Sequence, residues 1–162
     1  MADSLITPEI RAMVGQEAFF PGTEAVEKGV IKRYCVAVGD LNPLYLDEEY
    51  ARKTRYGGII APPTFVFSVN NKVDAPVGED GRPLGRVKLP PPLNRIARAG
   101  NEYEFGKPAR PGDVISARRK ITSIFEKEGK AGGLVFVEYE ITYTNQRQEV
   151  LGINRERLVF FK

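Results

Sequence analysis

The stretch "GLVFVEYEITYT", residues 133–144, decides the fold class of this chain. Every second residue from Val135 to Tyr143 is apolar or aromatic, and the residues between them are mostly polar. Strict alternation of this kind is typical of a β-strand with one face in a core. Turn-forming segments separate this stretch from three others that also have strand character, residues 101–108, 113–126 and 149–161. Long strands in series predict an antiparallel sheet.

An apolar segment, "GGIIAPPTFVFSVN" (residues 57–70), precedes these strands. Pro62 and Pro63 cannot lie inside a helix, but they can open one. The apolar run from Thr64 to Val69 then predicts a fully buried helix rather than an amphipathic one. We therefore expect an α+β fold in which an antiparallel sheet wraps around a central buried helix. We expect one domain over residues 1–162, because the chain contains no linker, repeat or low-complexity segment.

The first third of the chain predicts three short helices from their end signals. Thr7 followed by Pro8 is typical of a helix start, and Gly39 is placed to end a helix whose apolar residues are spaced three and four apart. Asp47 then caps a third helix, which has acidic residues in its first turn and basic ones in its last. Asp40 is therefore expected just after a helix end.

Composition limits the classes of protein to which the chain can belong. The 162 residues are 42% apolar and 28% charged, which indicates a folded globular protein. The net charge of +3 is small and scattered, so we expect no nucleic-acid partner. No apolar run is long enough for a membrane span, and the N-terminus lacks the pattern of a secretory signal. With a single cysteine, Cys35, expected to be a buried thiol, we expect a cytoplasmic location without membrane association.

The absence of histidine restricts the chemistry. It excludes histidine-based zinc sites and Ser-His-Asp triads, and one cysteine cannot form a thiolate cluster, so we expect no metal. Acid–base chemistry would have to use carboxylates, Tyr, Lys, Cys35 or water.

One basic stretch interrupts the even charge distribution. Residues 82–98 contain three consecutive prolines and no acidic residue, and their basic residues are Arg82, Arg86, Lys88, Arg95 and Arg98. Two interpretations stay open, a solvated irregular loop or a mobile basic flap that meets a phosphorylated ligand.

Three motifs in order resemble one known family. "AVGDLNPLYLDEEYA" (37–51), "GGIIAPPTF" (57–65) and "GNEYEFGKPARPGD" (100–113) together resemble the MaoC-like dehydratases, in particular the fatty-acid-synthase-like, or MaoC N-terminal, branch. The match in order and spacing runs from about Glu24 to the C-terminus. The resemblance implies a hot-dog fold, in which a long helix is cradled by an antiparallel sheet. It also implies (R)-specific hydration of 2-enoyl thioesters, or the reverse dehydration. The substrate carrier would be coenzyme A or acyl carrier protein, without a further cofactor.

The active-site signature of that family matches this chain only in part. The family places Asp, then Asn-Pro, then His, and the Asp and His hold a water and move protons. Asp40, Asn42 and Pro43 match, which implies a catalytic Asp40 and an orienting Asn42. Tyr45 stands where His is expected. A tyrosine with a pKa of about 10 is a poor base at neutral pH but can act as an acid.

A second departure lies where the apolar helix begins. Hydration builds negative charge on the thioester carbonyl oxygen, and an N–H at a helix N-terminus is a natural stabiliser of that charge. Catalytic family members carry His-Gly there, whereas this chain has Pro62-Pro63, and proline has no N–H. The Thr64 N–H remains, one residue further on. Loss of one such donor typically lowers a rate by about a hundred- to a thousand-fold.

Several functions stay open at this point. In the first, the chain shapes the substrate channel while a second MaoC-like subunit supplies Asp and His. In the second, Asp40 and Tyr45 catalyse hydration in a homodimer. A third is a non-enzymatic module that binds acyl thioesters. A thioesterase can also combine an acidic residue with a helix N-terminus, but the "DLNP" turn argues against it.

The remaining candidate residues concern binding of the thioester. Pro62, Pro63 and Thr64 would line the substrate site at the start of the apolar helix. Arg95 and Arg98 would either bind the phosphates of coenzyme A or be ordinary surface charges.

Overall fold

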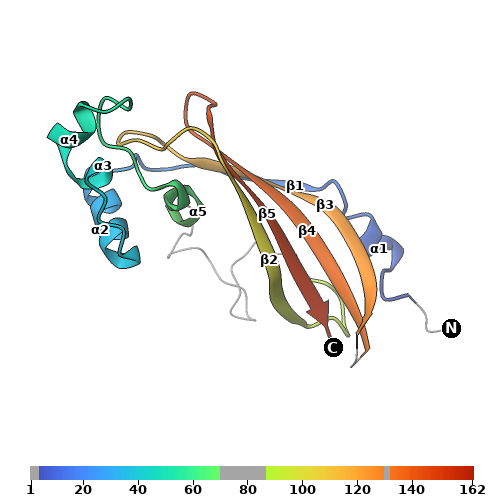
Figure 1. Ribbon diagram of the computed structural model, residues 1–162. Helices are drawn as coiled ribbons and strands as arrows, with labels where there is room; N and C mark the ends of the chain where they lie inside the picture. Colours follow the sequence, from blue (N-terminus) through green and yellow to red (C-terminus); the bar gives the residue numbers. More distant parts are fainter. Residues whose placement is uncertain (1–3, 70–86, 130–131) are drawn as a thin grey trace.

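A five-stranded antiparallel sheet is the main body of the molecule (Figure 1). The computed structural model describes residues 4–69, 87–129 and 132–162. The strands lie in the order β1-β3-β4-β5-β2 and are β1 (Glu17–Phe20), β2 (Arg95–Phe105), β3 (Ser116–Gly129), β4 (Gly132–Thr144) and β5 (Val150–Phe161). The four strands expected from the sequence and the α+β class are confirmed. β1 was not expected, and it forms by pairing with residues 117–120 of β3.

Short helices lie at both ends of the sheet (Figure 1). α1 lies beside β3, whereas α2 to α4 gather beyond the opposite end, with α5 between them and the sheet. The helices are α1 (Pro8–Arg11), α2 (Lys28–Val38), α3 (Pro43–Leu46), α4 (Glu48–Arg52), the 3₁₀ turn η1 (Pro63–Phe65) and α5 (Val66–Val69). No helix in the described part of the chain is long and apolar enough to cross a membrane.

The end signals of the first helices act as the sequence predicts. The Thr7 hydroxyl accepts the Ile10 N–H, and the Asp47 carboxylate accepts the Tyr50 N–H at 3.0 Å. Gly39 ends α2 with a left-handed φ of 74°.

The helix that begins at the prolines is buried on one side only. Phe65 and Val66 are buried, whereas Thr64 and Ser68 are exposed. The prediction that the run from Thr64 to Val69 is enclosed on all sides is therefore wrong for this chain taken alone. Its apolar side packs between α2 and the end of the sheet, and its hydroxyl-bearing side faces out, where water can satisfy it.

The basic stretch is not irregular throughout. Arg95 and Arg98 lie on β2, opposite Phe161 and Leu158 of β5, so both the loop and the flap interpretation are wrong for these two residues. The Arg95 guanidinium lies over the Phe161 ring, 5.1 Å from its centroid. Cross-strand partners from a distant segment thus order them. Arg82 and Arg86 lie outside the described residues.

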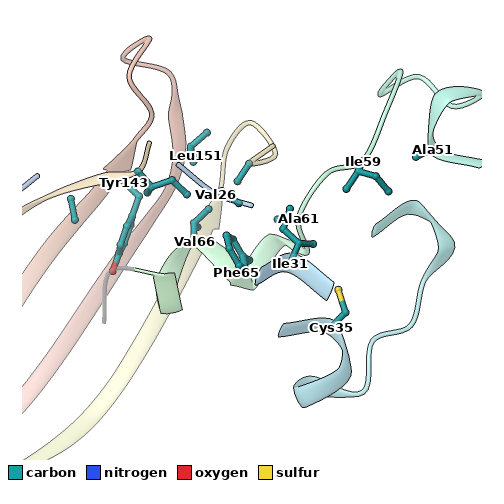
Figure 2. Close-up of a cluster of buried hydrophobic side chains, with 13 residues drawn as sticks. Val26, Ile31, Cys35, Ala51, Ile59, Ala61, Phe65, Val66, Tyr143 and Leu151 are labelled. Atoms are coloured by element: carbon teal, nitrogen blue, oxygen red, sulfur yellow. The ribbon is translucent and has the colours of Figure 1, made fainter. Parts of the chain in front are cut away.

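Two apolar clusters hold the molecule together. One joins α2, η1 and α5 to the end of the sheet, and it includes Ile31, Phe65, Val66 and the fully buried Cys35 (Figure 2). The other covers the opposite end of the sheet, where Ile10 of α1 packs near Val135 and Phe160. The first cluster fixes the helices that carry the candidate site.

Candidate active site

Asp40 is held at the end of α2 by the way that helix terminates. Gly39 is left-handed, so the chain turns back and the Asp40 N–H donates to the Cys35 carbonyl at 3.0 Å. The Asp40 side chain is half-buried, and its Oδ1 accepts the Asn42 N–H at 3.4 Å. The helix end therefore places this carboxylate near enough to Cys35 and Tyr45 for its charge to act on both.

Asn42 and Pro43 start the next helix. The Asn42 Oδ1 accepts the Leu44 N–H at 3.0 Å, and Pro43 occupies the first helical position of α3. The Asn42 side chain thus caps α3, while its backbone N–H donates to Asp40. Tyr45 follows on α3 and packs, half-buried, against the first cluster.

Burial and the charge of Asp40 raise the pKa values of two neighbouring groups, Tyr45 and Cys35. Burial raises the pKa of Tyr45, and the charge of Asp40 raises it further, with smaller contributions from Cys35 and Tyr56. Burial, followed by the Asp40 charge, also raises the pKa of the Cys35 thiol. At neutral pH Tyr45 therefore keeps its proton, so it can donate a hydrogen bond or act as an acid but cannot serve as the base.

The predicted thioester-contacting residues at the start of η1 lie against α2, where Tyr34 contacts Thr64 and Phe65. Pro62 is buried, Pro63 and Thr64 are exposed, and the Pro62 carbonyl accepts the Phe65 N–H at 2.9 Å. Within the described residues, the Thr64 backbone N–H has no protein acceptor. Because Pro62 and Pro63 have no N–H, the Thr64 N–H is the backbone donor that remains at the start of η1.

Tyr34 connects the two parts of the site. Its hydroxyl donates to Thr64 Oγ1 at 2.9 Å, and its ring meets the Phe65 ring edge-on at 5.4 Å. Sequence reasoning did not include it among the site residues. The available signal was its place on the apolar stripe of α2, next to Cys35, with a polar tip.

The structure does not bring the arginines to this site. Arg95 pairs with Phe161 beside the C-terminus, at the end of the sheet away from α2 to α4 (Figure 1). Arg98 Nη2 lies 2.8 Å from the Glu156 carboxylate. Among the described residues, no group of three or more acidic, cysteine or histidine side chains is placed to hold a metal.

Sequence comparison gives relatives over most of the chain. Residues 12–153 match the family model described as FAS1-like, dehydratase domain region. A probable enoyl-CoA hydratase alpha subunit of Thermomonospora curvata is 32% identical over 94% of this chain, and the chain spans 51% of that protein. A UPF0336 protein of Streptomyces coelicolor is 32% identical, over 74% of this chain and 75% of its own length. The chain thus spans about half the length of the hydratase alpha subunit.

Solved structures share the fold. The ChsH1-ChsH2 complex of Mycobacterium tuberculosis aligns with a TM-score of 0.74 at 21% identity, over 90% of this chain and 83% of the other. The MaoC-like dehydratase of Rhodospirillum rubrum aligns with a TM-score of 0.63 at 27% identity, over 92% of each chain. The HadBC (3R-hydroxyacyl-ACP dehydratase) complex of Mycobacterium tuberculosis aligns with a TM-score of 0.64 at 22% identity, over 91% and 96%. Since the family model covers most of its length, the chain belongs to the FAS1-like dehydratase domain region family, a branch of the MaoC-like hot-dog dehydratases.

Proposed function

We propose that this chain is one subunit of an (R)-specific 2-enoyl thioester hydratase, or 3-hydroxyacyl thioester dehydratase, that carries an acyl group on coenzyme A or acyl carrier protein. In this proposal it shapes the substrate channel, and a second MaoC-like subunit supplies the acid–base pair. The observation that carries the proposal is Tyr45, a half-buried phenol with a raised pKa at the position of the family's histidine, beside Asp40.

The chemistry explains why this substitution matters. Hydration adds the oxygen of water to C3 of the enoyl group, a base takes a proton from that water, and an acid gives a proton to C2. The pair that moves these protons works best with pKa values near the operating pH. Tyr45 holds its proton too tightly for that exchange, and Pro62-Pro63 removes the backbone donors nearest to a thioester carbonyl. Both changes lower the expected turnover of the chain alone.

The comparisons support a partner subunit. One relative is named as an alpha subunit, and two of the structures with this fold are complexes of two different chains. A chain that has lost part of the proton-transfer machinery but kept the fold is suited to such an assembly.

The test is steady-state hydration of crotonyl-coenzyme A by the purified protein, alone and with a cognate subunit that has an intact Asp–Asn-Pro–His signature. We expect little or no turnover alone and restored turnover in the complex. Asp40→Asn in the complex should change kcat by less than about threefold, because the working pair lies in the other chain. Robust activity of the protein alone, abolished by Asp40→Asn, would overturn the proposal.

A second candidate rests on the proximity of Asp40 and Tyr45. In a homodimer, Asp40 would take the proton from water and the protonated Tyr45 would give one to C2. Tyr45→Phe distinguishes the two candidate functions, because it keeps the aromatic ring and removes the hydroxyl group that would act as the acid. The variant should abolish turnover in this second candidate and leave the activity of the two-subunit complex unchanged in the first. A module that only binds acyl thioesters would show no turnover in either assembly.

A further inference from the structure

A buried tyrosine hydroxyl lies on the inner face of the sheet. Tyr143 of β4 is only 7% exposed, and its ring meets the Phe67 ring edge-on at 5.3 Å. Figure 2 shows its hydroxyl at the end of the side chain that points away from Leu151. Among the described residues this hydroxyl has no hydrogen-bond partner. Since buried polar groups in native structures are almost always paired, its orientation requires an explanation.

Aromatic side chains from two other elements lie next to the Tyr143 ring on this face of the sheet. Phe67 lies between two phenols, with its centroid 4.5 Å from that of Tyr103 and 5.3 Å from that of Tyr143. It reaches the sheet because Gly152 lies opposite Tyr143, and a Cβ at Gly152 would come within 2.8 Å of the Phe67 ring. The glycine therefore allows the ring to lie against the strand.

Exposure along this face decreases from the sheet edge inwards. Phe105 and Tyr103 on the edge strand β2 are 53% and 43% exposed, whereas Tyr143, two strands further in, is buried. A chain-like ligand that crosses the β2 edge would meet aromatic rings first and the Tyr143 hydroxyl last.

The charges nearby indicate which group that hydroxyl can bind. Burial raises the pKa of Tyr143 to about 12, and Glu156 and Tyr103 raise it while Arg119 and Arg98 lower it. The phenol is thus a donor at any physiological pH. Glu156 is paired with Arg98 at 2.8 Å, so the two charges offset each other and neither is free to pair with a charged group of a ligand. Burying a further, unpaired charge beside this hydroxyl would be unfavourable, whereas a neutral oxygen acceptor can accept its hydrogen bond.

We infer that this face is a specificity subsite in which the Tyr143 hydroxyl donates a hydrogen bond to a neutral oxygen, a keto or hydroxyl group, on the acyl chain of the substrate. Phe67 and Tyr103 contact the apolar part of the chain before that oxygen. The inference rests on the proposed function, since it takes the acyl thioester as the ligand. It narrows the substrate class from any apolar acyl chain to chains with an oxygen substituent remote from the thioester.

The experiment is a binding titration that needs no turnover. Decanoyl-coenzyme A and its 5-oxo, 7-oxo and 9-oxo derivatives are titrated calorimetrically into the protein, alone and in complex with its cognate subunit. At least one oxo derivative should bind about tenfold more tightly than decanoyl-coenzyme A, as expected for one hydrogen bond in a desolvated site. Equal affinity for all four thioesters would refute the subsite and leave the proposed function intact. Failure of every thioester to bind would refute the proposed function, and the subsite with it.

Variants separate recognition from a structural role. Tyr143→Phe should lose the preference for the oxo chain and keep its affinity for decanoyl-coenzyme A. It should unfold at the same or a higher denaturant concentration, because the hydroxyl has no partner among the described residues. Tyr139→Phe is the matched control, since Tyr139 is buried on the same strand and the same face. It should keep the preference. Retention of the preference in Tyr143→Phe, or its loss in Tyr139→Phe alone, would contradict the assignment.

Discussion

Two tyrosines determine how this chain can handle protons. Without histidine, no side chain has an ordinary pKa near 7, so proton transfer at neutral pH depends on shifted groups. In Tyr45 and Tyr143 burial is the largest cause of the shift, and it raises both pKa values. Both residues therefore keep a proton that they can donate in a hydrogen bond. In the function proposed above, these phenols orient the thioester, whereas Asp40 is the site residue suited to accept a proton.

The raised pKa of Tyr143 predicts a loss of stability at high pH. The folded state keeps the phenol proton to about pH 12, whereas the unfolded chain releases it near pH 10. Stability from this group is complete below pH 10 and is lost as the pH rises to 12, by at most about 3 kcal/mol. Urea unfolding at pH 8, 10 and 11.5 should show this decline in the wild type and a smaller one in Tyr143→Phe. Tyr50→Phe, at a half-exposed position, should follow the wild type.

The role of a single residue can be predicted from the sequence when it depends on neighbours a few positions away in the chain. Asp40 and Asn42 lie together at a helix junction, as expected, because both act through backbone groups a few residues away. Tyr143 was placed on the correct face of its strand, but its hydroxyl was not recognised as part of a site. That feature depends on Phe67 and Glu156, which come from distant segments, and no local pattern brings them together.

Among the secondary-structure elements, the end of α2 has the clearest link to the site. Gly39 has a φ of 74° with no atom within 4 Å of an added Cβ, so Gly39→Ala would be strained by conformation alone. We expect this variant to lower the free energy of unfolding by about 1 kcal/mol, measured by urea denaturation. Gly58→Ala is the control, since Gly58 also has open space around it but no left-handed φ, and it should be neutral or slightly stabilising. Equal effects at the two positions would contradict this account of the helix end.

Elements with local end signals were predictable, and those that depend on pairing were not. Thr7, Gly39 and Asp47 each bond within four or five residues, so their helices follow from the sequence. β1 has four residues without a clear alternation, and it exists because β3 lies beside it. The start of β2 at Arg95 was missed for the same reason, since a charged segment after three prolines becomes a strand only against β5.

For the molecule as a whole, the open edges of the sheet matter most. β1 at one edge has four residues, whereas β2 at the other has eleven and leaves Tyr103 and Phe105 exposed. A long edge strand with exposed aromatic side chains is a ready template for pairing with another chain. The same edge leads to the subsite inferred at Tyr143, so a second subunit placed there would close that proposed subsite from outside.

We therefore predict that the protein associates through β2, either with itself or with the catalytic subunit proposed above. Light scattering at micromolar concentration should give a mass well above the 18.1 kDa of one chain. Phe105→Lys should weaken association at least tenfold, because it places a charge among apolar groups that the contact would remove from water. Phe19→Lys on β1 is the matched control, since Phe19 is 57% exposed and Phe105 is 53% exposed. A stable monomer in the presence of the cognate subunit, or equal weakening by the two variants, would show that β2 is not the interface, and the acyl subsite would then open to solvent at this edge.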